Sequence, residues 1–267
     1  MDPMTSFGLN HKIYFFAVGF LAFWVGFFGF FLPTHVDWAL PWLVPPLHAR
    51  FLGSMYLSGA TFMILCLLAR RWDEVRVVLP MIAIWTGMLF IISLFYLSEF
   101  NFAKPQPWIW FGAYLAYPLI ALWLAWQYRH ADTHPVGTAL PNWAKIYFLA
   151  QGIIATLLGL VLLLAPNFMV SVWPWKITQL LAQLYSAPFL SYGIGSLLLA
   201  RRQTWAEVRI PVTATLVFAV GVLIASILHQ GLFSAADRSD WLWFIGFGVA
   251  SLMLGVLSVR AFGVTRL

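Results

Sequence analysis

The side chains best suited to chemistry in this sequence are polar residues at the ends of its long apolar runs. They are imidazoles, carboxylates, one guanidinium and one amide, namely His35, Asp37, His48, Arg50, Glu99, Gln183 and His229. Arg50 begins one apolar run and Glu99 ends the next, a geometry that allows an ion pair between them. If these groups converge, their place at the outer edge of a membrane suits an enzyme that acts on a lipid-like substrate.

The sequence lacks the spacing patterns of metal, haem and nucleophilic sites. A metal site needs three or four converging ligands, which neither His35 with Asp37 nor His48 with Arg50 supplies. No histidine falls deep within an apolar run, where facing histidines would hold b-type haem. The single cysteine, Cys66, excludes an intrachain disulfide. We therefore expect no metal and no required cofactor.

The composition predicts a membrane protein, because 62% of the residues are hydrophobic and only 9% are charged. A helix needs about 20 residues to cross ~30 Å of hydrocarbon. Eight apolar runs are long enough, at residues 12–32, 48–69, 76–98, 107–128, 143–165, 177–200, 208–230 and 240–261. The expected fold class is an all-α integral membrane protein with eight transmembrane helices.

The second half of the chain repeats the first with a shift of 133 residues, the distance from Lys12 to Lys145. The residues Lys12–Phe15 return as Lys145–Phe148, and Trp72–Arg76 returns with one substitution as Trp205–Arg209. Apolar residues often coincide by chance in membrane proteins, but Trp, Lys, Glu and Arg in one register seldom do. We interpret the chain as an internal duplication.

This duplication predicts a domain organisation. The first four-helix repeat comprises residues 1–132, a cytoplasmic linker comprises residues 133–142, and the second four-helix repeat comprises residues 143–267. Four spans are an even number, so the two repeats share one orientation. A 4+4 parallel repeat of this kind has its pseudo-twofold axis along the membrane normal.

Lys and Arg predict the orientation through the positive-inside rule. With the N-terminus inside, eleven basic residues lie on the inner side: Lys12, Arg70, Arg71, Arg76, Arg129, Lys145, Arg201, Arg202, Arg209, Arg260 and Arg266. The outer side has only Arg50, Lys104, Lys176 and Arg238. We therefore expect both termini to be cytoplasmic, in a plasma membrane of the bacterial inner-membrane type. The net charge of +6 thus reflects topology and does not indicate nucleic-acid binding.

Small residues predict which helix faces pack together, and tryptophans predict which segments lie at the membrane interfaces. Small residues recur on one helical face in three runs, at Gly19, Ala22, Gly26, Gly152, Ala155, Gly159, Gly248, Ser251 and Gly255. Such stripes are typical of close helix contacts in membranes. Six tryptophans at the ends of runs are expected to anchor in the interfaces: Trp38, Trp42, Trp72, Trp173, Trp175 and Trp205.

The apolar interior of the predicted spans argues against an ion-coupled transporter or a pump. Ion-coupled transporters and pumps place ionisable residues inside the membrane, and these spans offer only hydroxyls and amides there. The leading interpretation is a non-catalytic accessory or scaffold subunit that contacts lipids and other membrane subunits. A bound lipid, quinone or pigment and a homo-oligomer are compatible with it. The alternatives are a facilitative transporter with its path between the repeats and the outer-edge enzyme above.

The repeat generates a first prediction. Arg50→Ala is expected to fold and insert, because the second repeat has the uncharged Gln183 at the equivalent position. The measurement is the yield of monodisperse protein extracted from membranes, compared with wild type. A variant that fails to insert, or that is degraded, would contradict the prediction.

Overall fold

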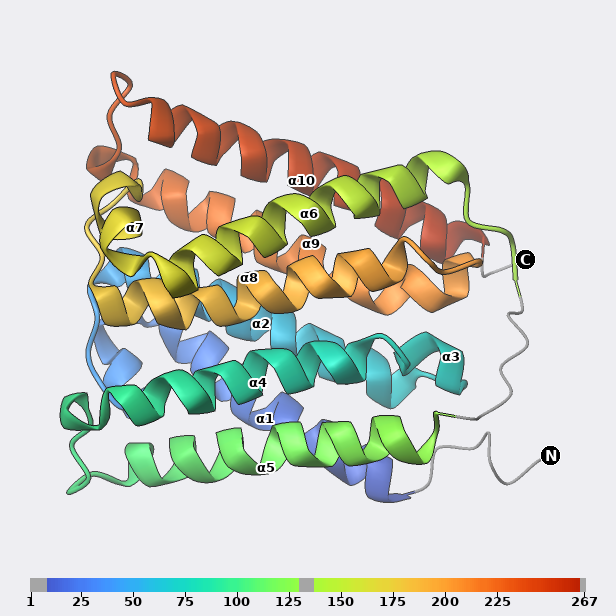
Figure 1. The fold of residues 1–267 in the computed structure, drawn as a ribbon, viewed down its shortest axis with the longest axis horizontal. Helices are drawn as coiled ribbons and strands as arrows, with labels where there is room; N and C mark the ends of the chain where they lie inside the picture. The colour runs from blue at the N-terminus through green and yellow to red at the C-terminus, as the bar shows by residue number, and fades with distance from the viewer. Residues whose placement is uncertain (1–8, 130–136, 265–267) are drawn as a thin grey trace.

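The computed structural model describes residues 9–129 and 137–264, which form a bundle of helices without a β-strand. The long helices in these ranges lie side by side along one axis and are joined at both ends (Figure 1). They are α1 (Leu9–Phe31), α2 (Pro46–Leu68), α4 (Val78–Phe95), α5 (Pro105–Gln127), α6 (Asn142–Leu164), α8 (Gln179–Leu199), α9 (Trp205–Leu228) and α10 (Arg238–Val264). Residues 133–136 of the predicted linker lie outside the described residues, as do residues 130–132.

Seven stretches within the described ranges are long and apolar enough to cross a membrane. They are Asn10–Phe31, Pro46–Leu68, Trp72–Phe95, Pro105–Gln127, Asn142–Leu164, Trp205–Leu228 and Arg238–Gly263. The chain is therefore a multi-pass helical membrane protein. Helix α8, predicted as a span over residues 177–200, is more polar than these seven because it carries two glutamines and several serines. Most of α8 is buried, so protein surrounds it.

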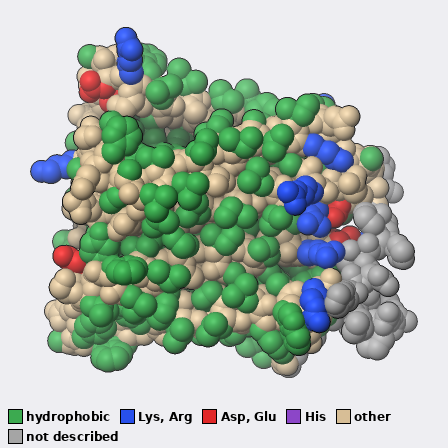
Figure 2. Space-filling view, in the orientation of Figure 1, with side chains coloured by type: hydrophobic (Ala, Val, Ile, Leu, Met, Phe, Trp, Pro, Cys, Tyr) green, Lys and Arg blue, Asp and Glu red, His purple; other side chains and the backbone are tan. Residues whose placement is uncertain are grey.

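The two ends of the bundle differ in charge. One end, which we call the arginine-rich end, contains the connections at residues 69–77 and 200–204 and the first residues of α1 (Figure 1). Figure 2 shows basic side chains gathered at this end and apolar side chains over the middle of the bundle. The opposite end contains four short helices: η1 (Pro33–Trp38), η2 (Leu97–Glu99), α7 (Pro166–Val172) and η3 (Gln230–Leu232).

The third span differs from the prediction of one helix over residues 76–98. It begins with a separate turn, α3 (Trp72–Val75), and α4 then continues to Phe95. At its start, Glu74 Oε2 accepts a hydrogen bond from the Arg70 backbone N–H at 3.2 Å. In the second half, Glu207 accepts the equivalent bond from the Gln203 N–H and also forms a capping box with Thr204, and that helix is continuous from Trp205.

Each half contributes the same kinds of helix contact. Helix α1 packs along α2, and α6 packs along α8. Likewise α4 packs against α5, and α9 against α10. Between the halves α2 packs against α9 and α4 packs against α8, which places these four helices at the centre of the bundle.

Glycines allow the close approach of α1 to α2 and of α6 to α8. A Cβ atom at Gly26 would lie 2.9 Å from the Leu57 backbone nitrogen, and one at Gly159 would lie 2.9 Å from the Leu190 nitrogen. Both distances are too short for a real Cβ, so only glycine fits. Gly19 and Gly152 make similar contacts, with Met63 and Leu197. Ala22 lies opposite Gly59, and Ala155 is half-buried.

The predicted packing stripe on α10 differs. A Cβ atom at Gly248 or Gly255 would meet nothing within 4 Å, and Ser251 is only half-buried. Helix α10 lies at the edge of the bundle and buries a different face, with Trp243, Leu254 and Leu257, against α9. The stripe therefore does not form a helix contact within the described chain.

The predicted interfacial tryptophans also differ from expectation. Trp72, Trp173, Trp175 and Trp205 are all less than 10% exposed, while Trp38 is 57% exposed. Trp42 is half-buried against Phe100 and Trp110. The reason is that the connection before α8 folds inward, so Trp173 and Trp175 pack on Tyr185 and Trp243 instead of facing headgroups. Of the six rings, Trp38 is the one free to reach the interface.

The glycine contacts generate a matched pair of variants. Gly26→Ala is expected to lower the free energy of unfolding by about 1–3 kcal/mol, because the added methyl group overpacks the α1–α2 contact. Gly248→Ala is the control, since the same methyl group enters open space on α10. Reversible unfolding in mixed detergent micelles measures both. Equal stability of the two variants would show that the close approach is not tight in solution.

Candidate functional site

The predicted polar cluster divides in the structure. Arg50 Nη1 lies 2.6 Å from His229 Nε2, in the second half of the chain, instead of pairing with Glu99. Glu99 is exposed and no ion pair joins it to Arg50, so the ion pair that the sequence allows between them does not form. The cause is the rotation of α2, which turns the fifth residue of that helix toward α9 and away from the end of α4.

Two more predicted residues belong to η1 and have contacts other than this one. His35 is exposed and bonds Thr34 at 3.0 Å, beside the Trp38 ring. Asp37 is half-buried, and its backbone carbonyl accepts a hydrogen bond from the Gln106 amide at 3.1 Å. Both residues therefore belong to the local structure of η1 and α5.

His48 is buried between the two halves. It is 6% exposed, its Nδ1 lies 3.0 Å from the Tyr185 hydroxyl, and the Trp175 ring packs edge-on against it. Tyr185 is fully buried. A histidine enclosed in this way has no open face for a substrate, so its contact stabilises the fold.

The contact of Arg50 with His229 has a counterpart related to it by the repeat, and both contacts join the two halves. The Tyr96 hydroxyl donates to Gln183 Oε1 at 2.6 Å, and Tyr96 and Gln183 are separated from His229 and Arg50 by the same 133 residues. In the middle of the bundle, Ser58 donates to the Ala214 carbonyl at 2.6 Å and Ser191 donates to the Met81 carbonyl at 2.8 Å. Ser58 and Ala214 in turn correspond to Ser191 and Met81 by the same shift. These polar contacts hold the halves together, so the predicted cluster is mainly part of an interface.

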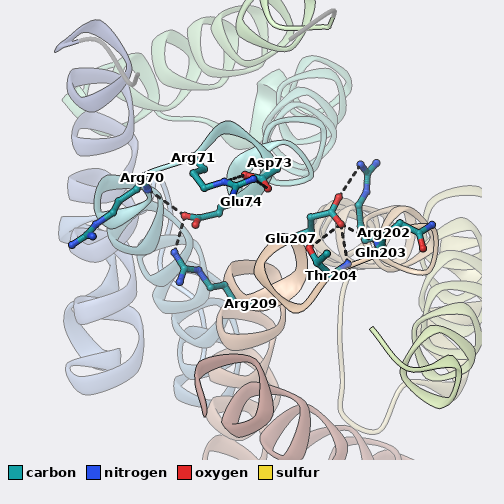
Figure 3. Close-up of polar contacts among 9 residues, drawn as sticks. All are labelled: Arg70, Arg71, Asp73, Glu74, Arg202, Gln203, Thr204, Glu207 and Arg209. Carbon is teal, nitrogen blue, oxygen red and sulfur yellow. Dashed lines mark hydrogen bonds and ion pairs between the residues drawn. The ribbon is translucent and has the colours of Figure 1, made fainter. Parts of the chain in front are cut away.

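The arginine-rich end adds an ion pair between the halves. Arg209 Nη2 lies 2.7 Å from Glu74 Oε2, as Figure 3 shows. The neighbouring charges pair locally: Arg71 with Asp73 at 2.7 Å and Arg202 with Glu207 at 3.7 Å. Each of the three carboxylates is nearly buried and is already bonded, which suits a structural role. Among the described residues no three His, Cys, Asp or Glu side chains group as metal ligands would.

A cavity in the first half is the strongest candidate for a binding site. It lies among α1, α2, α4 and α5 and has a volume of about 420 Å³. This volume is within the ~300–1,000 Å³ range of small-molecule sites. Its walls include Val25, Met63, Ile82, Trp85 and Ile109, and none of the lining residues is charged. The cavity therefore suits an apolar occupant.

The cavity extends between α1 and α5. These two helices contact each other near the arginine-rich end, where the Tyr14 hydroxyl donates to the Tyr117 carbonyl at 2.9 Å. Trp24, Trp38 and Ile109 also line the cavity. Helix α5 lies at the edge of the bundle (Figure 1), and only 22% of its apolar stretch is buried.

The polar groups of the cavity are few. The Tyr56 and Tyr114 hydroxyls bond to each other in its wall, and both side chains are less than 10% exposed. Nearby, the Trp110 indole donates to Ser93 Oγ at 2.9 Å. At the opposite end, Gln106 Oε1 is buried and has no hydrogen-bond partner in the described chain. No group of this set is a nucleophile with an adjacent base, so the arrangement suits binding better than catalysis.

Sequence reasoning missed Tyr56, Tyr114 and Gly59 because a tyrosine or glycine in an apolar run is typical of a core. A signal was nevertheless present in the repeat. The second half has Phe189, Phe247 and Tyr192 at the equivalent positions, so the hydroxyls and the space are specific to the first half. The Tyr192 ring stacks on Phe218 with centroids 4.9 Å apart.

The Arg50–His229 contact generates a pH prediction. A guanidinium only donates, so His229 Nε2 accepts and the ring is neutral. Burial, and then the charge of Arg50, lower the pKa of His229 below its ordinary value of about 6.5. The unfolded chain therefore binds more protons than the folded chain near and below pH 6.5, and stability falls as the pH drops through this range.

The measurement is the thermal midpoint between pH 7.5 and 5 for wild type and for His229→Gln. The glutamine accepts the same hydrogen bond without titrating, so its midpoint should fall less than that of wild type. Parallel curves for the two proteins would exclude His229 as the group responsible.

Comparison with known proteins gives no relative for this chain. No protein-family model, no curated protein and no solved structure matches it. The evidence for function is therefore the geometry of the cavity and of the interface between the halves.

Proposed function

We propose that this chain is a non-catalytic, polytopic membrane protein that binds a hydrophobic molecule from the bilayer in the cavity of its first half. It serves as an accessory or scaffold subunit of a larger membrane complex. The observation that carries the binding role is the cavity of about 420 Å³ without a charged lining residue, whose walls include apolar residues of α1 and α5. An occupant of this cavity is a lipid, a quinone or a similar apolar molecule.

We also propose that the eight long helices form a 4+4 parallel repeat. Bonds that recur at the 133-residue shift support it: Trp110 donates to Ser93 at 2.9 Å, and Trp243 donates to Ser226 at 3.0 Å. The Trp108 and Trp241 indoles also recur, each donating to the carbonyl six residues earlier in the chain. The exchanged contacts at the interface fit a pseudo-twofold axis along the membrane normal, with α8 as the eighth span.

The proposed orientation places the arginine-rich end in the cytoplasm. Short basic loops are retained on that side of a bacterial-type plasma membrane. The first residues of α1 and the last of α10 lie at this end (Figure 1), in agreement with two cytoplasmic termini. The expected partners are membrane lipids and other membrane subunits.

The two alternative functions have less support. A solute path along the axis between the halves would cross Ser58 and Ser191, which are buried and hydrogen-bonded to the facing helix. An outer-edge enzyme would need Arg50 and Glu99 to converge, and Arg50 instead bonds His229. Neither arrangement offers an open polar site.

The experiment fills the cavity. A Cβ atom at Gly59 would lie 3.6 Å from Ala22 Cβ and 3.9 Å from the Trp85 ring, so a side chain fits there and extends into the space. Gly59→Leu is expected to reduce the amount of co-purifying hydrophobic molecule at least tenfold. Native mass spectrometry and lipid extraction of protein purified in mild detergent measure this amount and also detect stoichiometric subunits.

Gly112→Leu is the matched control, because that exposed glycine on α5 has nothing within 4 Å. Both variants replace a helical glycine by leucine, so helix propensity changes equally. A bound molecule that survives Gly59→Leu, or a wild-type protein that carries none, would refute the binding role. Wild-type protein without partner subunits would refute the accessory role alone.

A further inference from the structure

The Tyr56–Tyr114 pair has one hydrogen-bond donor more than the protein uses. Each phenol has one proton, and their mutual hydrogen bond uses one of the two. Neither hydroxyl makes another hydrogen bond among the described residues, and both tyrosines line the cavity. The pair therefore presents a single O–H donor to whatever fills the cavity.

The second half of the chain indicates that folding does not require these hydroxyls. Phe189 and Phe247 occupy the positions equivalent to Tyr56 and Tyr114, with the same rings and no oxygen. Phe189 is buried and Phe247 packs on the Trp243 ring at 4.5 Å. Since burying a hydroxyl with an unused proton costs free energy, the first half has a reason other than packing to keep both.

Aromatic side chains flank the pair on both sides. The Trp85 ring lies 6.0 Å from the Tyr56 ring, and the Trp110 ring lies 4.4 Å from the Tyr114 ring. The Trp110 indole N–H is already used by Ser93. The donor is thus set in an apolar, aromatic surface without charge, which disfavours an anionic or cationic group because its charge would be unpaired.

We propose that the Tyr56–Tyr114 pair donates this hydrogen bond to a neutral carbonyl oxygen of a ligand with an apolar chain. The proposal rests on the proposed function and names the chemistry that the cavity recognises. Two membrane molecules supply such a carbonyl: the ring of an isoprenoid quinone and the ester of a neutral glycerolipid. The flat aromatic walls favour the quinone ring.

The test compares three probes in nanodiscs: decylubiquinone, dioleoylglycerol and decylbenzene. The first two carry carbonyls, and the third has a ring and chain but no acceptor oxygen. Affinity is obtained from the rise of the unfolding midpoint with the mole fraction of probe. In wild type, one or both carbonyl probes should bind more tightly than decylbenzene, and which of them does so identifies the source.

The variants are Tyr56→Phe, Tyr114→Phe and the double variant. Each introduces phenylalanine, the residue found at the equivalent position of the second half. The double variant is expected to weaken the carbonyl probes roughly three- to tenfold, the usual effect of one hydrogen bond, and to leave decylbenzene unchanged. Each single variant keeps one hydroxyl with a free proton, so it should lose less. Tyr117→Phe is the control, because that cavity hydroxyl already donates to the Ala17 carbonyl.

The outcomes separate the two proposals. A double variant that binds carbonyl probes as wild type does, or a wild type that binds decylbenzene equally well, overturns the role of the hydroxyls while the cavity remains a binding site. If no probe raises the midpoint of wild type, and Gly59→Leu behaves identically, both proposals fail.

Discussion

Two halves of a membrane protein gain little from the hydrophobic effect when they pack in lipid, because lipid chains are as apolar as leucine. Close contact and hydrogen bonds must supply the association. In this chain the helices that meet between the halves, α2 with α9 and α4 with α8, exchange bonds from serine hydroxyls to backbone carbonyls in the middle of the bundle. The other helices then pack on this central group, α1 and α6 through glycines. The cavity and both ends of the bundle depend on that frame.

The cavity arises where the two halves differ within the same frame. Gly59 in α2 corresponds to Tyr192 in α8, and Trp85 corresponds to Phe218. In the second half these two rings stack. In the first half the glycine leaves space beside Trp85. In the second half the Tyr192 side chain occupies the volume that Gly59 leaves open in the first half. This difference explains why a bundle with repeated contacts has a cavity in one half.

Much of the fold could be predicted from the sequence, because apolar length and terminal prolines determine where helices begin and end. The predicted run 107–128 became α5 (Pro105–Gln127), and the run 143–165 became α6 (Asn142–Leu164). Hydropathy does not report how a helix is rotated, so it could not predict that Arg50 bonds His229. It also does not separate rings that face lipid from rings that face protein. For that reason Trp173 and Trp175 were placed in the headgroup layer.

The size of the cavity bears on what fills it. A space of about 420 Å³ with apolar walls is large enough for a ring or a length of hydrocarbon chain. Such a space is not left empty beside a bilayer, and an ordinary acyl chain would suffice to fill it. An acyl chain, however, offers no acceptor to the Tyr56–Tyr114 pair and would leave its free proton unsatisfied. The apolar walls thus explain why something binds, while the two hydroxyls, absent from the equivalent phenylalanines, explain why one kind of molecule would be preferred.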